Sequence, residues 1–201
     1  MKATYVPALL GLVLLASPAL AQSGPAFDCS KAEHEIEDLI CQDEELAAKD
    51  RKLAEVYAEA IKVMEGVDSG GPEAIKELKT YQRGWIGGRN ECWKADDKRQ
   101  CTADVYDRRI AQIQAKYFLI DGSEPVYYNC SDNSQIVVTF IPSKPPSIRM
   151  ERGDSTEVGI QVPWDSGSRY EADFGVFFQV KGDEAQVAWP QDNEFNCVVQ
   201  K

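Results

Sequence analysis

Two short stretches near the C-terminus carry side chains that can bind the carboxyl groups of another protein. The loop of residues 166–170 (SGSRY) offers the hydroxyl of Ser166, and residues 181–183 (KGD) offer the ammonium of Lys181. The second stretch is typical of a tight turn, because glycine tolerates positive φ and aspartate bonds to nearby backbone. A hydroxyl can hydrogen-bond to a carboxyl group, and an ammonium can pair with a carboxylate. Held at one end of a β domain, residues 165–185 therefore predict an edge that plugs another protein's active site.

Residues 1–21 predict a secretory signal. Lys2 supplies a positive start, residues 8–16 are almost wholly apolar, and residues 19–21 (ALA) form a small-residue cleavage site, with cleavage expected after Ala21. The apolar run is too short for a membrane span, and no cysteine follows Ala21 to carry a lipid anchor. We therefore expect a soluble mature protein that is periplasmic or secreted.

The cysteines predict disulfides rather than a metal site. The chain has six cysteines, no CxxC pair and a single histidine, His34, so zinc is disfavoured. An even cysteine count in an exported chain favours disulfides. Local spacing and a link between the first and last β-strands favour Cys29–Cys41, Cys92–Cys101 and Cys130–Cys197. The sequence alone also permits other connectivities.

The charge balance points away from nucleic acid. Residues 22–201 carry 21 basic and 33 acidic side chains, whereas nucleic-acid binding depends on clustered Lys and Arg. An acidic surface favours rapid capture of a cationic protein. It also keeps an exported protein soluble, and charge alone does not separate these two explanations.

The first half of the mature chain, residues 22–119, reads as a small helical bundle. Apolar residues recur at helical spacing, as at Leu46, Leu53 and Tyr57. In the third helix we expect Tyr81 to face inward. Helices are predicted over residues 32–40, 43–64, 73–86 and 102–118. A domain this small needs its disulfides for stability.

After a linker at residues 120–125 (IDGSEP), residues 126–201 read as an all-β domain. Residues 135–140 alternate between apolar and polar side chains, which indicates one buried and one wet face. Strands are predicted at 126–130, 135–141, 147–152, 158–162, 169–172, 176–180, 186–189 and 196–199. About eight short antiparallel strands predict a small barrel or sandwich, so the fold class is α+β with two domains.

The helical half resembles a known domain in four segments: FDCSKA, EIEDLICQDEELAAKDRKLAEVY, YQRGWIGGRNEC and CTADVYDRRIAQI. Over residues 27–113 it is similar to the DUF1311-type domain at the start of LprI-type lysozyme inhibitors. The matching positions are Cys29, Ile40, Cys41, Leu46, Asp50, Leu53, Tyr57, Gln82, Trp85, Arg89, Cys92, Cys101, Tyr106 and Arg109. We expect four of these, Asp50, Gln82, Arg89 and Arg109, to form a structural network, because arginine forks suit carboxylates.

The β half resembles the MliC/PliC family through YNC at residues 128–130, SGSRY, KGDEA at residues 181–185 and a closing Cys197. These are bacterial inhibitors of c-type lysozyme built on a small antiparallel β-barrel. The resemblance implies that Ser166 and Lys181 enter the lysozyme cleft and that Tyr170 shapes the loop. The full set implied to bind lysozyme is Ser166, Gly167, Arg169, Tyr170 and Lys181.

Two features of the β half leave alternatives open. Arg169 either lies at the rim of the contact or pairs with Glu171 or Asp173. The run before Lys181 is one residue longer than in the family and has Phe178 where the family has Trp. An added residue reverses the alternation of a strand unless a bulge absorbs it.

The sequence therefore predicts an exported inhibitor of c-type lysozyme, a cationic partner, with no catalytic residue, cofactor or metal. A c-type lysozyme cleft holds one protonated and one ionised carboxyl group, which suit the serine and the lysine. The alternative is a non-inhibitory peptidoglycan-binding or glycan-binding module that presents aromatic faces to sugars. Its candidate aromatic residues are Tyr128, Trp164, Tyr170 and Trp189. An enzyme finds no support beyond abundant carboxylates, and the role of the helical half and the oligomeric state stay open.

Overall fold

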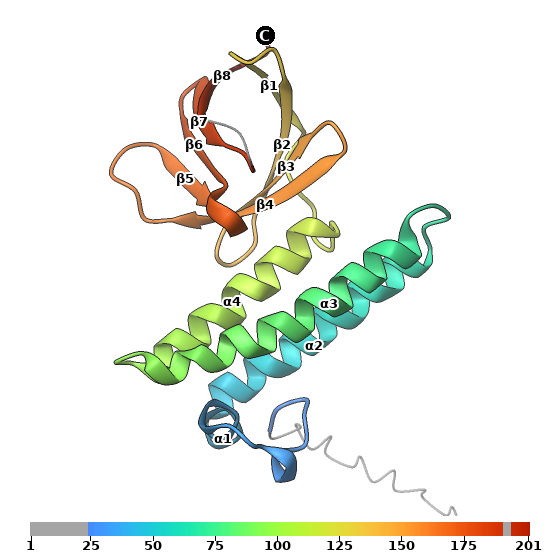
Figure 1. Cartoon of the computed structure of the whole chain (residues 1–201), viewed down its shortest axis with the longest axis vertical. Helices are drawn as coiled ribbons and strands as arrows, with labels where there is room; N and C mark the ends of the chain where they lie inside the picture. The colour runs from blue at the N-terminus through green and yellow to red at the C-terminus, as the bar shows by residue number, and fades with distance from the viewer. Residues whose placement is uncertain (1–23, 191–193) are drawn as a thin grey trace, which may run out of the picture.

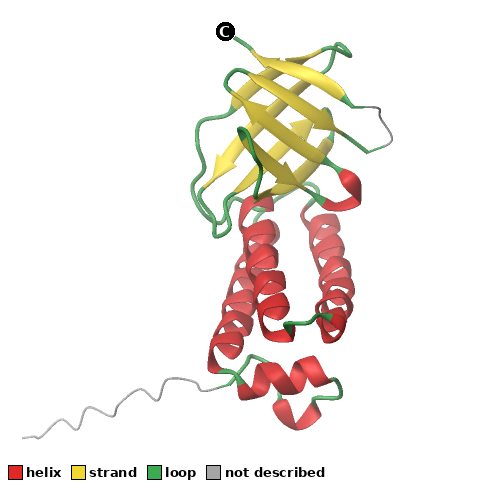
Figure 2. Ribbon diagram, turned by 90° about the vertical axis from the view of Figure 1, so that its left-hand side faces the viewer, coloured by secondary structure: helices red, strands yellow, loops and turns green. Residues whose placement is uncertain are grey.

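A computed structural model describes residues 24–190 and 194–201. The predicted signal at residues 1–21 lies outside these ranges. The described part consists of a helical half followed by a closed barrel of eight antiparallel strands. Figure 2 shows the strands curled into the barrel at one end of the molecule and the helices at the other. The predicted α+β class and the barrel are confirmed.

Four α-helices make up the helical half within the described residues. They are α1 (Glu35–Gln42), α2 (Glu44–Glu65), α3 (Gly71–Asn90) and α4 (Lys98–Lys116). Helix α2 packs against both α3 and α4, and α1 lies across one end of the bundle (Figure 1). Leu46 and Leu53 lie in the buried core and Tyr57 packs against it, as their helical spacing predicts.

Two of these helices begin earlier or later than the sequence suggests because of their capping residues. His34 lies at the N-cap of α1, where its Nδ1 accepts a hydrogen bond from the Ile36 amide at 3.2 Å. The histidine was expected inside a helix and instead starts one. Helix α4 begins at Lys98 rather than Thr102, because Asp97 caps it by accepting from the Gln100 amide.

A polar chain crosses the helical core around Arg89, which is only 3% exposed. Its Nη2 pairs with Glu37 Oε1 at 3.1 Å, and its Nη1 donates to the Tyr106 hydroxyl at 3.1 Å. That hydroxyl donates in turn to Asp50 Oδ1 at 2.8 Å. Arginine, tyrosine and both carboxylates thus satisfy one another in the core.

The expected four-residue network is in fact divided. Arg109 bonds to Gln82 Oε1 through its Nε at 3.1 Å, and within the described residues this pair has no hydrogen bond to the chain around Arg89. Tyr81 was expected to face inward, and this expectation is wrong, since Tyr81 is 46% exposed. Its ring lies beside the β domain. The helical periodicity of the bundle carries no information about this neighbour.

The strands follow one another around the barrel in sequence order, and β1 closes against β8. Their bounds are β1 (Val126–Cys130), β2 (Gln135–Ile141), β3 (Ser147–Arg152), β4 (Ser155–Val162), β5 (Ser168–Glu171), β6 (Phe177–Lys181), β7 (Glu184–Ala188) and β8 (Phe195–Val199). Inward side chains such as Ile136, Met150 and Phe178 are fully buried. The apolar side chains of the alternating pattern therefore point inward and form one core inside the barrel.

All six cysteines lie in the described part of the chain, and none is free. The bonds are Cys29–Cys41, Cys92–Cys101 and Cys130–Cys197. These are the three pairs that the sequence favours, two by local spacing and the third as a link between the first and last strands. The last bond joins directly opposed residues of β1 and β8, at the seam that closes the barrel.

The two halves contact each other along one side of the barrel. Helix α4 packs against β3 and β4, and the Arg149 guanidinium lies 4.7 Å from the centre of the Phe118 ring. Before β1, Ser123 donates its amide to the Phe140 carbonyl at 2.8 Å, and its hydroxyl accepts from the Phe140 amide at 3.1 Å. The connecting segment is thus held along β2. Within the described residues, no helix is long and apolar enough to cross a membrane.

Candidate functional site

The loop before β5 and the turn after β6 lie at the same end of the barrel. Strands β5 and β6 are antiparallel, with Ser168 opposite Val180, so the start of one strand meets the end of the other. Ser166 lies in the loop two residues before Ser168, and Lys181 directly follows Val180 at the end of β6. We call residues 164–169 and 181–183 the loop edge.

Gly167 brings the two parts of the loop edge into contact. Its φ is +79°, and a Cβ built on it would lie 2.2 Å from the Val180 carbonyl oxygen and 3.2 Å from Lys181 Cβ. Both the left-handed backbone and this close approach require glycine. The loop therefore packs against the backbone that leads into Lys181.

The turn after β6 is short and tied to the C-terminal strand. Gly182 has φ +61°, and Lys181 pairs with Glu184 across a two-residue connection. The Asp183 carbonyl accepts from the Val199 amide at 2.9 Å. Since the C-terminus lies at the end of the barrel remote from the helices (Figure 1), the turn points away from the helical half.

Strand β6 pairs without a bulge. Each residue of Phe177–Lys181 has a partner in β7, and the pairing with β5 is equally continuous. Phe178 faces the core at 0% exposure, and Val180 packs against the same core. Alternation from these two residues places Lys181 on the outer surface of the barrel.

The two residues predicted to enter a partner are both exposed. Within the described residues, neither the Ser166 hydroxyl nor the Lys181 ammonium forms a side-chain hydrogen bond or an ion pair. Both groups are therefore available to carboxyl groups of another molecule.

Arg169 is held within the loop edge. Its Nε donates to Glu171 Oε1 at 2.8 Å, as one of the sequence alternatives anticipates. The guanidinium also lies 4.5 Å from the centre of the Trp164 ring and 4.0 Å from that of Phe177. Trp164 is 49% exposed next to Ser166, and the lysozyme-binding set did not include it. Its only sequence signal is an aromatic side chain directly before a small-residue loop.

Tyr170 is buried beneath the loop at 7% exposure. Its ring packs edge-on to Phe140 with centroids 6.0 Å apart, and a Cβ on Gly159 would come within 2.9 Å of Tyr170 Cβ. Burial raises the pKa of its hydroxyl. Tyr170 therefore contributes packing below the loop rather than a surface group.

The aromatic platform suggested for glycan binding is absent among the described residues. Tyr128, Tyr170 and Trp189 are each at most 7% exposed, and only Trp164 of the four candidates presents a ring to solvent. Strand alternation turns Tyr128 and Tyr170 toward the barrel core, and Trp189, directly after β7, packs in the same core. In the described ranges, no group of three or more His, Cys, Asp or Glu side chains is placed to hold a metal ion.

Comparison with known families separates the chain into the same two halves. The family described as lysozyme inhibitor LprI matches residues 29–122. The family MliC, described as membrane-bound lysozyme-inhibitor of c-type lysozyme, matches residues 128–196. The second match contains the whole loop edge.

Individual curated proteins are also similar to the chain. Lipoprotein LprI of Mycobacterium tuberculosis and that of Mycobacterium bovis are each 22% identical over 151 residues, covering 74% of this chain and 72% of the relative. Uncharacterized protein R02472 of Rhizobium meliloti is 34% identical over 127 residues, 54% of this chain and 91% of that protein. No solved structure matches significantly. The chain therefore carries an LprI-type domain over residues 29–122, followed by an MliC-type domain over residues 128–196.

Proposed function

We propose that the protein inhibits c-type lysozyme by inserting the loop edge into the lysozyme active-site cleft. The observation that carries the proposal is the free Ser166 hydroxyl and free Lys181 ammonium at one exposed end of an MliC-type barrel. The inhibitor acts by binding lysozyme and has no catalytic activity of its own. It acts outside the cytoplasm, after removal of residues 1–21.

The chemistry of the cleft suits these two groups. One lysozyme carboxyl group is kept protonated and the other is ionised. The ammonium of Lys181 pairs with the ionised carboxylate, and the hydroxyl of Ser166 hydrogen-bonds to the protonated group. Removing one partner of such a buried charge pair costs about 2–5 kcal/mol of affinity.

Neighbouring residues, in the loop edge and beneath it, position these two groups. Gly167 lets the loop approach β6, and Tyr170 supports it from the core. Arg169 and Trp164 stack at the rim, where they contact the lip of the cleft. The acidic excess of residues 121–201, 13 acidic against 6 basic side chains, draws a cationic lysozyme toward the barrel.

Purified mature protein should block lysis of labelled cell walls by a c-type lysozyme at a stoichiometric ratio. Ser166→Ala and Lys181→Ala should each weaken inhibition, and the lysine variant should lose the larger share, about 2–5 kcal/mol. High salt should slow association. Undiminished lysis at an excess of folded inhibitor would contradict the proposal.

Matched variants separate the loop edge from general changes of charge or polarity. Lys144→Ala removes an exposed lysine beside the helical half. Ser155→Ala removes an exposed serine at the start of β4, the end of that strand opposite the loop edge. Both should inhibit like the unmodified protein. Sedimentation with insoluble peptidoglycan, and wall hydrolysis without lysozyme, should both be negative. Positive results would favour a wall-binding module or an enzyme.

A further inference from the structure

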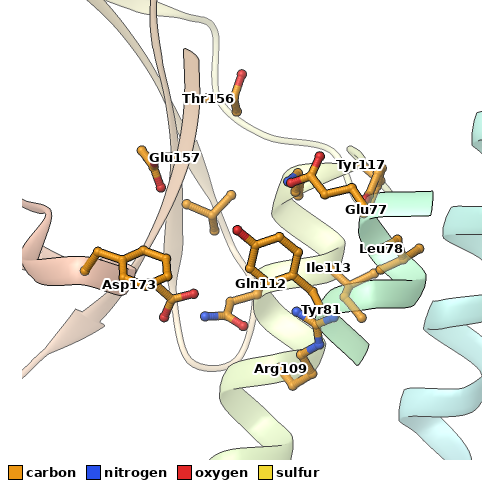
Figure 3. A pocket seen from close by; sticks show the side chains of 13 residues that line it. Glu77, Leu78, Tyr81, Arg109, Gln112, Ile113, Tyr117, Thr156, Glu157 and Asp173 are labelled. Atoms are coloured by element: carbon orange, nitrogen blue, oxygen red, sulfur yellow. The ribbon is translucent and has the colours of Figure 1, made fainter. Parts of the chain in front are cut away.

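A cavity of about 140 Å³ lies between the helical half and the barrel. Helices α3 and α4 supply one wall, including Tyr81, Arg109 and Gln112, and the barrel supplies Glu157 and Asp173 opposite (Figure 3). This volume far exceeds the roughly 10–15 Å³ that one water molecule needs. The cavity is remote from the loop edge, so the proposed lysozyme contact does not account for it.

Arg109 lines this cavity and carries a buried donor that has no acceptor among the described residues. The residue is 8% exposed, and its Nε bonds to Gln82. Its buried Nη2 has no hydrogen-bond partner within the described part of the chain. Burial lowers the pKa of the guanidinium, while nearby groups including Asp173 act in the opposite direction. A buried guanidinium with a free donor calls for an acceptor, and a carboxylate matches its fork.

The opposite wall carries two carboxylates that are also unpaired. In the described residues, neither Glu157 nor Asp173 forms a side-chain hydrogen bond or an ion pair. Burial raises the pKa of Glu157. The remaining charges of the cavity satisfy each other, since Lys116 Nζ lies 2.7 Å from Glu77 Oε1. Within the described residues, one guanidinium with an unsatisfied Nη2 and two unpaired carboxylates therefore line the space.

This arrangement selects the charge pattern of a ligand. A simple anion would satisfy Arg109 but would meet two carboxylates, and a simple cation would leave the Arg109 donor unsatisfied. A molecule with one carboxylate and two ammonium groups complements all three. Phe174, which also lines the cavity and is 87% exposed, offers an apolar face for a short methylene chain.

We propose that this interdomain cavity binds a basic amino acid, free or at the end of a peptide, with its carboxylate on Arg109 and its ammonium groups on Asp173 and Glu157. Gln112 and the Tyr81 hydroxyl, on the helical wall, supply neutral hydrogen bonds (Figure 3). Because each domain contributes one wall, the ligand also joins the two domains.

Calorimetric titration of the mature chain, without lysozyme, tests the ligand class. L-lysine should bind more tightly than alanine, which has one ammonium group fewer. Hexanoate and hexylamine, which each keep one charged group and the alkyl chain, should bind much more weakly than lysine. Absence of lysine binding, or equal binding of lysine and hexanoate, would overturn the proposal.

Variants test the residues. Asp173→Asn, an exposed and isosteric change, and Arg109→Gln should each weaken lysine binding about tenfold or more, the expected result of losing one charged hydrogen bond. Arg83→Gln and Asp154→Asn remove the same charges at exposed positions outside the cavity and should bind lysine like the unmodified chain. If Arg109→Gln fails to fold, Asp173→Asn decides alone. Unchanged lysine affinity in folded Asp173→Asn would refute the assignment.

Discussion

Gly167 shows how much of the loop edge depends on one residue. The loop can reach β6 only where the backbone has positive φ and no Cβ intervenes between Gly167 and the Val180 carbonyl. Gly153, in the turn between β3 and β4, also has positive φ at +56°, but a Cβ there would meet nothing within 4 Å. Both glycines therefore adopt a backbone conformation with positive φ, but only Gly167 is closely packed against its neighbours.

Gly167→Ala should destabilise the protein more than Gly153→Ala. Left-handed backbone costs a non-glycine residue about 1–2 kcal/mol, and only at position 167 is the overlap with Val180 added. Thermal unfolding of both variants measures the difference. Inhibition of lysozyme should fall in Gly167→Ala and stay unchanged in Gly153→Ala. Equal behaviour of the two variants would contradict the described contact between the loop and β6.

Among the elements, α2 begins at a cap that also links two helices. Asp43 Oδ1 accepts from the amides of Glu45 and Leu46, each at 3.0 Å. Its Oδ2 accepts from Arg99 Nε of α4 at 2.6 Å. The hydrogen bond from Arg99, followed by that from the Leu46 amide, holds the pKa of Asp43 below its usual value.

This lowered pKa predicts how stability changes with pH. A carboxyl group whose pKa falls on folding stabilises the protein at pH values above the group's pKa in the unfolded chain, near 3.8. This contribution disappears as the pH falls through the pKa of the group in the folded protein. Asp43→Asn keeps a capping oxygen and removes the charge. Its melting temperature should be lower than that of the unmodified protein at pH 7, and the difference should vanish in strong acid.

Asp43→Ala is the companion variant for this experiment. It removes the capping oxygen as well as the charge, which costs about 1 kcal/mol of helix stability. It should therefore melt below Asp43→Asn at pH 7. A difference between Asp43→Asn and the unmodified protein that stayed constant down to pH 2 would show that the charge of Asp43 is not responsible.

For the molecule as a whole, stability depends on closing the barrel and on keeping the two halves in contact. The Cys130–Cys197 bond spans 67 residues and joins the first strand to the last. The Cys92–Cys101 bond in the helical half spans only 9. Since a cross-link restricts the unfolded chain more when it closes a longer loop, the two bonds should differ in their effect.

Replacing Cys130 and Cys197 by alanine should cost roughly 4 kcal/mol of unfolding free energy, against roughly 3 kcal/mol for Cys92 and Cys101. Urea titration followed by tryptophan fluorescence measures both, since Trp189 lies in the barrel and Trp85 in the helices. If the shorter bond proved the more important, barrel closure would not depend on the Cys130–Cys197 link.

The periodicity of the sequence determined most of the secondary structure, and the spacing and domain positions of the cysteines determined the favoured pairs. Strands β1, β2 and β3 have the predicted bounds, because their alternating side chains face one core and one solvent side. The three disulfides match the favoured pairs, because each joins neighbours in sequence or the two ends of one domain. Short-range patterns carry this information without knowledge of the partner surfaces.

Tertiary structure decided what depends on contacts between distant segments. The pairing of β1 with β8 closes the sheet into a barrel rather than a sandwich. The packing of α4 on β3 and β4 forms the cavity beside the exposed Tyr81. The Nη2 of Arg109, which has no hydrogen-bond partner within the described residues, lies near the same contact, since its surroundings come from both halves. At the loop edge, the residue types of Ser166 and Lys181 indicated the chemistry. Only the register of β5 against β6 brought them to one end, because pairing between strands is a property of the folded sheet.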